Sequence, residues 1–127
     1  MTRRFVQATR PSLCVLMETE VWPALIHSCH QESVPVALVN ARLSEKSLRQ
    51  AQRFAGLFRE AAKKISLFAA QTQADAERLR QLGAENVTVT GSLKFDIAPP
   101  EPMIELGAQW RRQFGQRPVL LCASTRE

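Results

Sequence analysis

Short apolar or β-branched runs alternate with segments of helical periodicity along most of this 127-residue chain. The runs are residues 13–17 (LCVLM), 35–39 (PVALV), 65–70 (ISLFAA) and 87–90 (VTVT). A continuous apolar run is typical of a strand that is buried on both faces, as in parallel sheets covered by helices. Strands that alternate with single helices are joined by right-handed crossovers. The sequence therefore predicts an α/β fold with a Rossmann-like parallel sheet.

Helix signals occupy the segments between these runs. Pro23 stands in a predicted first turn, where proline is tolerated. The apolar positions of this helix are spaced i, i+3, i+4 and i+7 and are Trp22, Leu25, Ile26 and Cys29. Ser44 is predicted to cap one long helix. The predicted core stripe of that helix includes Phe54, Leu57, Phe58 and Ala61. Thr72 and Asp75 have capping-box spacing, and the helix they open is predicted to close at Gly83.

The last quarter of the chain predicts a boundary between two domains. Three prolines within residues 97–103 (IAPPEPM) predict a linker without regular structure. Residues 104–114 are predicted to form a helix and residues 119–123 (VLLCA) a buried strand. We predict a partial N-terminal Rossmann-like domain at 1–96, the linker at 97–103, and the truncated start of a second domain at 104–127.

Polar side chains follow each of the four predicted strands at its carboxyl end, where ligands bind in open parallel sheets. The residues at these junctions include Glu18 and Glu20 after the first strand, Asn40 and Arg42 after the second, Gln71 after the third, and Lys94 and Asp96 after the fourth. The opposite junctions, at residues 31–33 and 83–85, resemble ordinary solvated turns. This asymmetry predicts a ligand site along one edge of the sheet.

The charged residues at this edge suit a charged ligand. Glu18 is nearest to the strand end and is predicted to point into a crevice, whereas Glu20 equally fits a structural acid at a helix start. Lys94 lies on a glycine-led turn and is the predicted counter-charge, with surface solvation as the alternative. Arg42 precedes a helix start, where a guanidinium and free N–H groups suit a carboxylate or phosphate.

Several other kinds of site are not indicated. Neither GxGxxG nor GxxxxGK[ST] occurs, so no dinucleotide or P-loop site is predicted. Both histidines belong to one predicted helix, which argues against a Ser-His-Asp arrangement. The three cysteines, Cys14, Cys29 and Cys122, lack CxxC spacing and are interpreted as small hydrophobic residues in a reducing compartment. We predict no metal and no cofactor.

Positive charge is concentrated in residues 42–64, which hold seven basic and two acidic residues in a chain of net charge +5. Such a face attracts nucleic acid, anionic lipid or a phosphorylated ligand, although a merely solvated helix face has the same pattern. No apolar run approaches the ~20 residues that span a bilayer, and the start of the chain lacks the apolar core of a signal peptide. The sequence therefore predicts a soluble or peripheral protein.

Five motifs in register resemble a known family. They are METEVWP, NARLSEKS, AAQTQADAERLRQLGA, TGSLKFD and CASTRE. In this order and spacing they are similar to the 3-deoxy-D-manno-octulosonic acid (Kdo) transferases of Gram-negative bacteria. The resemblance implies a GT-B glycosyltransferase that transfers Kdo from CMP-Kdo to a lipid A precursor at the cytoplasmic face of the inner membrane. It also implies an inverting reaction without a bound metal and indicates no obligate protein partner.

The roles of the family's site residues are assigned to this chain only at positions where its motifs match those of the family. Glu18 matches the first acid of the family's ETExWP motif and Lys94 the lysine of its G(S/N)LKFD motif, so the resemblance implies that both stabilise charge in the transition state. Ser124, Thr125 and Arg126 match the start of its STxE segment, which contributes to CMP binding. Many members have histidine in place of Arg126. The residues predicted to bind substrate are Glu20, Asn40, Arg42 and Gln71.

The resemblance also predicts what the chain lacks. The family's general-base glutamate lies upstream of ETExWP and most of its cytidine site lies downstream of STxE, so residues 1–127 alone are predicted to be inactive. The basic segment 42–64 suits peripheral contact with an anionic membrane. The Kdo transferase hypothesis includes no nucleic-acid partner. The alternative is a non-catalytic Rossmann-like module that binds an anionic ligand or nucleic acid through residues 42–64.

Overall fold

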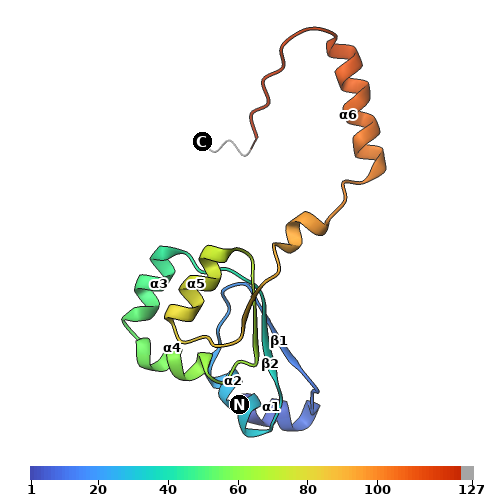
Figure 1. Ribbon diagram of the computed structural model, residues 1–127. Coiled ribbons are helices and arrows are strands. Elements are labelled where there is room, and N and C mark those ends of the chain that lie inside the picture. The colour runs from blue at the N-terminus through green and yellow to red at the C-terminus, as the bar shows by residue number, and fades with distance from the viewer. Residues whose placement is uncertain (124–127) are drawn as a thin grey trace. The chain divides into compact units, whose positions relative to one another are not determined.

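A four-stranded parallel sheet forms the centre of the computed structural model, which describes residues 1–123 (Figure 1). The strands are β1 (Cys14–Met17), β2 (Val36–Ala41), β3 (Leu67–Ala70) and β4 (Val87–Val89). They are hydrogen-bonded in the order β1-β2-β3-β4, and every pair is parallel. The predicted α/β class is therefore confirmed, and the carboxyl ends of all four strands lie at the same edge of the sheet.

Helices connect consecutive strands, and their ends follow the predicted caps. They are α1 (Thr2–Thr9), α2 (Pro23–Gln31), α3 (Glu45–Gln52), α4 (Ala55–Ala62), α5 (Gln73–Gln81) and α6 (Glu101–Phe114), with a 3-10 turn η1 (Leu93–Asp96). The Ser44 side chain accepts the Ser47 N–H, and the Thr72 side chain accepts the Asp75 N–H. Gly83 follows α5 with φ +94°, a conformation that glycine adopts without steric cost.

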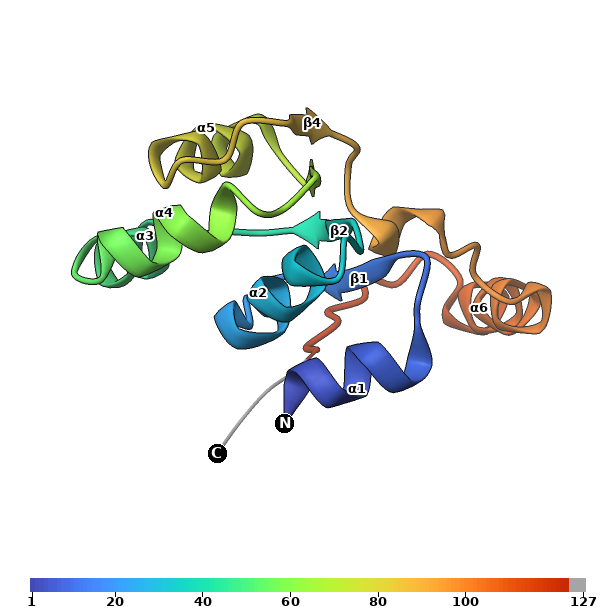
Figure 2. The same ribbon diagram turned by 90° about the horizontal axis from the view of Figure 1, so that it is seen from below.

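The hydrophobic core lies between the sheet and the helices of the compact unit Met1–Phe95. Leu16, Leu38 and Phe68 of the first three strands pack with Ile26 of α2 and Leu79 of α5. Figure 2 shows that α2, α3, α4 and α5 lie on the same side of the sheet. Within this unit, the helical layer therefore covers one face of the sheet and holds the strand ends in place.

The other face of the sheet differs from the prediction. Burial on both faces was expected for the first and third strands, but Val15, Met17 and Leu67 are 52%, 47% and 42% exposed. Successive strand residues point to opposite faces, and these three point away from the helical layer. The prediction is confirmed for β2, where five of the six residues are buried and Val39 is half-buried.

The long helix predicted from Ser44 is broken at Arg53–Phe54 into α3 and α4. Phe54 has non-helical dihedral angles, φ −119° and ψ 36°, so the apolar stripe of α3 does not continue in phase. Phe54 and Leu57, which were predicted to lie in the core, are 67% and 57% exposed. The core stripe is wrong at these two positions, whereas Ala61 is buried as predicted.

The second unit, Asp96–Glu127, differs from the sequence prediction in two places. Its helix begins at Glu101 rather than at residue 104, because Pro102 occupies the first turn, where no backbone N–H is needed. The strand predicted at 119–123 is absent from the described residues of this unit, because no neighbouring strand is there to accept its hydrogen bonds. The predicted domain boundaries remain a prediction.

Cys29 leads to a prediction about stability and pH. Desolvation by burial raises the pKa of its thiol from the ordinary 9.0 to about 11, and the adjacent Cys14 thiol adds to the shift. Because the unfolded thiol ionises first, this stabilising contribution is fully present below about pH 9 and is lost as the pH rises toward about 11. Urea unfolding across this interval is expected to show a smaller pH-dependent loss for Cys29→Ala than for the unmodified chain. Equal losses would contradict the prediction.

Candidate functional site

Glu18 extends the first strand at the edge where the predicted site lies. Its N–H donates to the Val39 carbonyl at 3.0 Å, which continues the β1–β2 ladder by one residue. Its backbone is left-handed, with φ +57°, which is uncommon for a residue other than glycine. The side chain is exposed. The carboxylate thus stands at the strand end, as predicted, on a backbone that is held in a costly conformation.

Asn40 joins two of the predicted junctions. It is 6% exposed and also left-handed, with φ +51°. Its Nδ2 donates to Glu18 Oε1 at 3.4 Å, and its Oδ1 accepts the Leu93 N–H at 3.3 Å. Lys94 follows Leu93 directly, so Asn40 links Glu18 to the backbone next to Lys94. The structure therefore brings Glu18 and the Lys94 turn to the same edge of the sheet.

The third junction meets the second through Gln71, whose Nε2 donates to the Asn40 carbonyl at 3.0 Å. Gln71 is the first residue after β3, and its N–H donates to the Ala41 carbonyl at 2.9 Å. After β4, Gly91 has φ +84° and turns the chain into η1, which carries Lys94. Ends of all four strands thus contribute to one region, as the polar asymmetry predicted.

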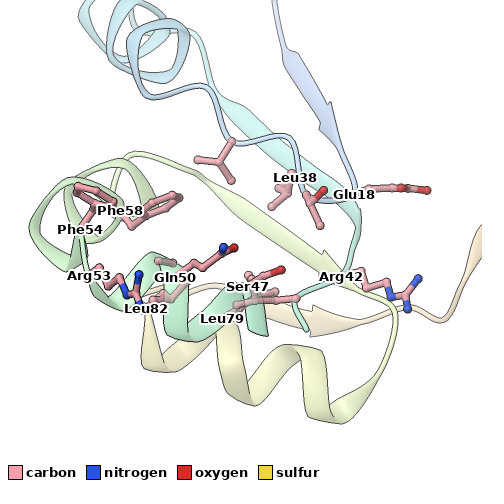
Figure 3. A pocket seen from close by; sticks show the side chains of 14 residues that line it. Glu18, Leu38, Arg42, Ser47, Gln50, Arg53, Phe54, Phe58, Leu79 and Leu82 are labelled. Atoms are coloured by element: carbon pink, nitrogen blue, oxygen red, sulfur yellow. The ribbon is translucent and has the colours of Figure 1, made fainter. Parts of the chain in front are cut away.

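Glu20 and Arg42, which were both predicted to bind substrate, have different surroundings in the structure. The Glu20 carboxylate accepts the Trp22 Nε1–H at 3.3 Å and so stabilises the turn into α2. This contact accords with its alternative interpretation as a structural acid, and a substrate contact stays a prediction. Arg42 and Glu18 both line a cavity of about 440 Å³. Figure 3 shows these two side chains at one end of the lining and Phe54 and Phe58 at the other.

The cavity is mostly apolar between those ends. It lies between the β1–α2 loop, α3, α4 and α5, and its apolar lining includes Val21, Leu38, Phe54, Phe58, Leu79 and Leu82. Its volume is within the range of small-molecule sites, about 300–1,000 Å³. The arrangement offers an apolar surface beside a carboxylate and a guanidinium. An amphiphilic ligand matches such a surface better than a free sugar does.

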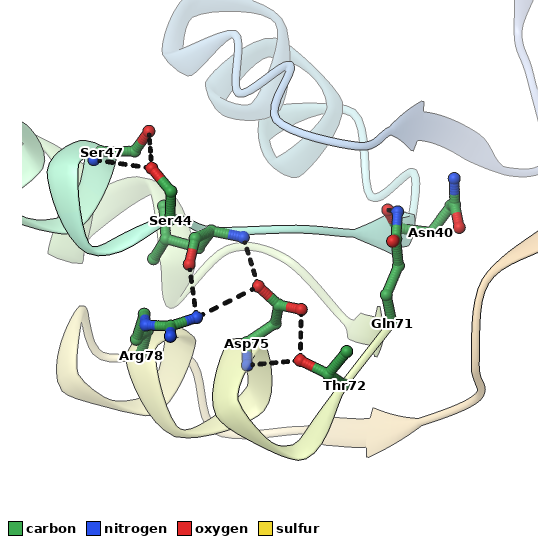
Figure 4. Close-up of polar contacts among 8 residues, drawn as sticks. Asn40, Ser44, Ser47, Gln71, Thr72, Asp75 and Arg78 are labelled. Atoms are coloured by element: carbon green, nitrogen blue, oxygen red, sulfur yellow. Dashed lines mark hydrogen bonds and ion pairs between the residues drawn. The ribbon is translucent and has the colours of Figure 1, made fainter. Parts of the chain in front are cut away.

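A buried network fixes the loop that carries Arg42 (Figure 4). Asp75 is 6% exposed, and its Oδ1 accepts the Leu43 N–H at 2.9 Å. Arg78 Nη1 donates to the Leu43 carbonyl at 2.9 Å and lies 3.4 Å from Asp75 Oδ1. The Thr72–Asp75 spacing predicted the helix cap, but it contains no signal for the bond to Leu43. This contact between β2–α3 and α5 is a feature that the sequence interpretation missed.

Three further predictions concern other parts of the chain. Within residues 1–123, no group of three or more His, Cys, Asp and Glu side chains is placed to hold a metal ion. The residues predicted to contact CMP, Ser124, Thr125 and Arg126, lie outside the described residues. In the part of the chain that the structure covers, no helix has the length and apolar content that crossing a bilayer requires.

Comparison with known proteins gives a consistent result. Residues 1–97 match the family described as 3-deoxy-D-manno-octulosonic-acid transferase (kdotransferase). The chain is 48% identical over 126 residues to the 3-deoxy-D-manno-octulosonic acid transferase of Bordetella pertussis and 33% identical over 128 residues to that of Haemophilus influenzae. These alignments cover 99% and 96% of this chain but only 29% of each relative.

A bifunctional glycosyltransferase/methyltransferase of Fusobacterium nucleatum is 35% identical over 119 residues, which are 90% of this chain and 18% of that protein. The chain therefore spans less than a third of the length of these curated relatives.

Proposed function

The chain belongs to the 3-deoxy-D-manno-octulosonic acid (Kdo) transferase family, and from this premise we propose that it forms part of a glycosyltransferase that moves Kdo from CMP-Kdo to a lipid A precursor. The supporting observation is that Asn40 bonds to Glu18 and to the backbone N–H of Leu93, the residue before Lys94, at the carboxyl edge of the sheet. The proposal includes a GT-B architecture, inversion at the anomeric carbon and no bound metal.

The charges that develop on the sugar and on the phosphate during transfer define separate roles for Glu18 and Lys94. The bond from the anomeric carbon of Kdo to the CMP phosphate breaks, which leaves positive charge on the sugar and negative charge on the phosphate. A carboxylate at Glu18 stabilises the first charge and the ammonium of Lys94 stabilises the second. An acceptor hydroxyl attacks the opposite face of the sugar and loses its proton to a general base, which the family places before ETExWP. We therefore expect residues 1–127 alone to be inactive.

The remaining roles complete the proposal. Residues 104–127 begin the donor domain, where Ser124, Thr125 and Arg126 contact the CMP moiety. Glu20, Arg42 and Gln71 surround the substrate, and Glu20 also holds Trp22. Asn40, which the sequence also predicted to bind substrate, is proposed to act through its bonds to Glu18 and Leu93. We propose that the enzyme works at a membrane, because its proposed acceptor is a lipid, and at the cytoplasmic face of the inner membrane, as the family resemblance implies.

The test of this function is segment replacement in a relative. Residues 1–127 replace the aligned segment of the Bordetella pertussis transferase, and Kdo transfer to a lipid A precursor is measured. We expect transfer by the chimera and none by the isolated 127-residue chain. A chimera that folds but transfers no Kdo would contradict the proposal.

Membrane contact is proposed for exposed residues of α3, α4 and the positions that cap these helices, which we call the basic surface. It consists of Arg49, Arg53, Phe54, Leu57, Arg59 and Lys63, all of which are exposed. The nearby acids Glu45 and Glu60 lie 4.0 and 3.9 Å from Arg49 and Lys63, contacts that are weak at an exposed surface. Apolar side chains among cations suit an anionic lipid surface better than a purely charged face does.

A double variant tests the basic surface. Phe54→Ser with Leu57→Ser is expected to weaken binding to vesicles containing phosphatidylglycerol by about tenfold or more, because two apolar side chains no longer enter the interface. Co-sedimentation measures the change. Val15→Ser is the matched control, since Val15 is 52% exposed but lies on the sheet rather than on α4. Equal vesicle binding by the double variant would contradict the role of the two apolar side chains. Salt-sensitive binding of RNA with no affinity for vesicles would favour the nucleic-acid alternative.

A further inference from the structure

We infer that Asn40 is a positioning residue that sets the orientation of the Glu18 carboxylate and the place of the Lys94 turn at the same time. The inference rests on the proposed function, because it takes Glu18 and Lys94 as the groups that stabilise the transition state. It assigns Asn40 a role through those two residues rather than a contact with substrate.

The backbone at Asn40 is arranged for this purpose. The pairing of β2 with β3 shifts register between Leu38 and Ala41, which is where Asn40 lies. Such an irregularity redirects a side chain, and it is common beside active sites. The left-handed φ of +51° is one that asparagine tolerates better than most residues. With this backbone, the Asn40 amide bonds to Glu18 at the end of β1 and to Leu93 in η1 after β4.

The Asn40 side chain forms hydrogen bonds through both its amide nitrogen and its amide oxygen. The amide nitrogen donates to Glu18 across 22 residues of sequence, and the amide oxygen accepts from Leu93 across 53 residues. An amide side chain supplies both a donor and an acceptor, whereas an ionised carboxylate supplies acceptors alone. At 6% exposure, Asn40 has little surface left for a ligand. Positioning is therefore the role that its contacts favour.

Two further features, one contact and one backbone conformation, support this arrangement. Gln71 donates to the Asn40 carbonyl, which fixes the peptide after the left-handed residue. Glu18 has a left-handed backbone as well, so the acid and the amide that orients it occupy two uncommon conformations side by side. Strained residues that bond to each other are a frequent feature of active sites, where the surrounding structure maintains the strain.

Amide hydrogen exchange in the 127-residue chain tests the geometry without any activity. Asn40→Gly keeps the left-handed backbone and removes the side chain, so exchange of the Leu93 N–H is expected to accelerate about fivefold. The Thr90 N–H, which bonds to the Ala70 carbonyl, is expected to keep its rate and serves as an internal control. Asn40→Asp retains an acceptor for Leu93 and is expected to preserve its protection. Unchanged exchange of Leu93 in Asn40→Gly would overturn the inference.

Kinetics in the Bordetella pertussis chimera test the effect on catalysis. Asn40→Gly and Asn40→Asp are each expected to lower kcat by up to about 100-fold with little change in KM, since both variants lose the donor to Glu18. In a Glu18→Ala background, Asn40→Asp is expected to cause little further loss, because its effect acts through the missing carboxylate. Ser28→Ala, at a buried polar residue of α2 whose hydroxyl donates to the Ala24 carbonyl, is the control for a purely structural effect.

The outcomes separate the two proposals. If Asn40→Asp lowers kcat in the Glu18→Ala background by as much as it does in the chimera with Glu18 intact, the positioning role is overturned. If Glu18→Ala itself leaves transfer unchanged, the catalytic assignment fails, while the exchange data still decide whether Asn40 holds Leu93.

Discussion

Glu18→Ala and Lys94→Ala are each expected to lower kcat for Kdo transfer by about 100- to 1,000-fold in the chimera, which is the loss typical of removing one group that stabilises transition-state charge. KM is expected to change little, because the charges that these groups meet develop mainly as the bond to CMP breaks. Combining the two substitutions is expected to cost less than the product of the single losses, since both residues act on the same bond.

Two conservative variants sharpen this experiment. Glu18→Gln keeps the size of the side chain and removes its charge, so it is expected to lose nearly as much activity as alanine. Glu85→Gln is the matched control, because Glu85 is an exposed acid at the opposite edge of the sheet. Thermal unfolding verifies that each variant is folded. Near-normal kcat in both Glu18→Ala and Lys94→Ala would remove the catalytic assignment.

Asp75→Ala is expected to lower the free energy of unfolding by roughly 2–4 kcal/mol, the largest stability change that we predict. The carboxylate is buried, and it accepts the Leu43 N–H and lies against the partly buried Arg78. Its removal leaves a backbone donor and a cation without their partner. It also removes the acceptor of the Thr72 hydroxyl at the start of α5. Urea denaturation measures the change.

Asp75→Asn separates the contribution of the hydrogen bond from Leu43 to stability from that of the attraction to Arg78. Asparagine keeps an oxygen for the Leu43 N–H and loses the attraction to Arg78, so a smaller loss is expected. Glu77→Ala, an exposed acid on the same helix, is expected to change stability by less than about 0.5 kcal/mol. A loss below about 1 kcal/mol for Asp75→Ala would show that the network in Figure 4 contributes little to stability.

Local signals predicted the elements well where a single residue sets a boundary. Ser44 and Thr72 cap their helices, and Pro23 begins another, because these effects depend on groups within one turn. Periodicity failed at Phe54 and Leu57, because it was extrapolated through a break in the helix that no local signal marked. The continuous apolar run gave a wrong prediction at Val15 and Met17, because burial depends on which faces of the sheet are covered.

The candidate site was predictable in outline and not in detail. The polar residues after each strand indicated the edge, because parallel strands bring their carboxyl ends together. The likeness of METEVWP and TGSLKFD to a family singled out Glu18 and Lys94. Neither source indicated that Asn40 bonds to both junctions, or that Trp22 engages Glu20.

The sequence by itself determined the alternation of strands and helices, the caps and the edge at which charges gather, because each depends on residues a few positions apart. The tertiary structure alone decided which groups meet. Asn40 reaches Glu18 and Leu93 across 22 and 53 residues, and Asp75 reaches Leu43 across 32. Such pairs depend on strand register and on the left-handed turns at Glu18 and Asn40, and a linear pattern contains neither.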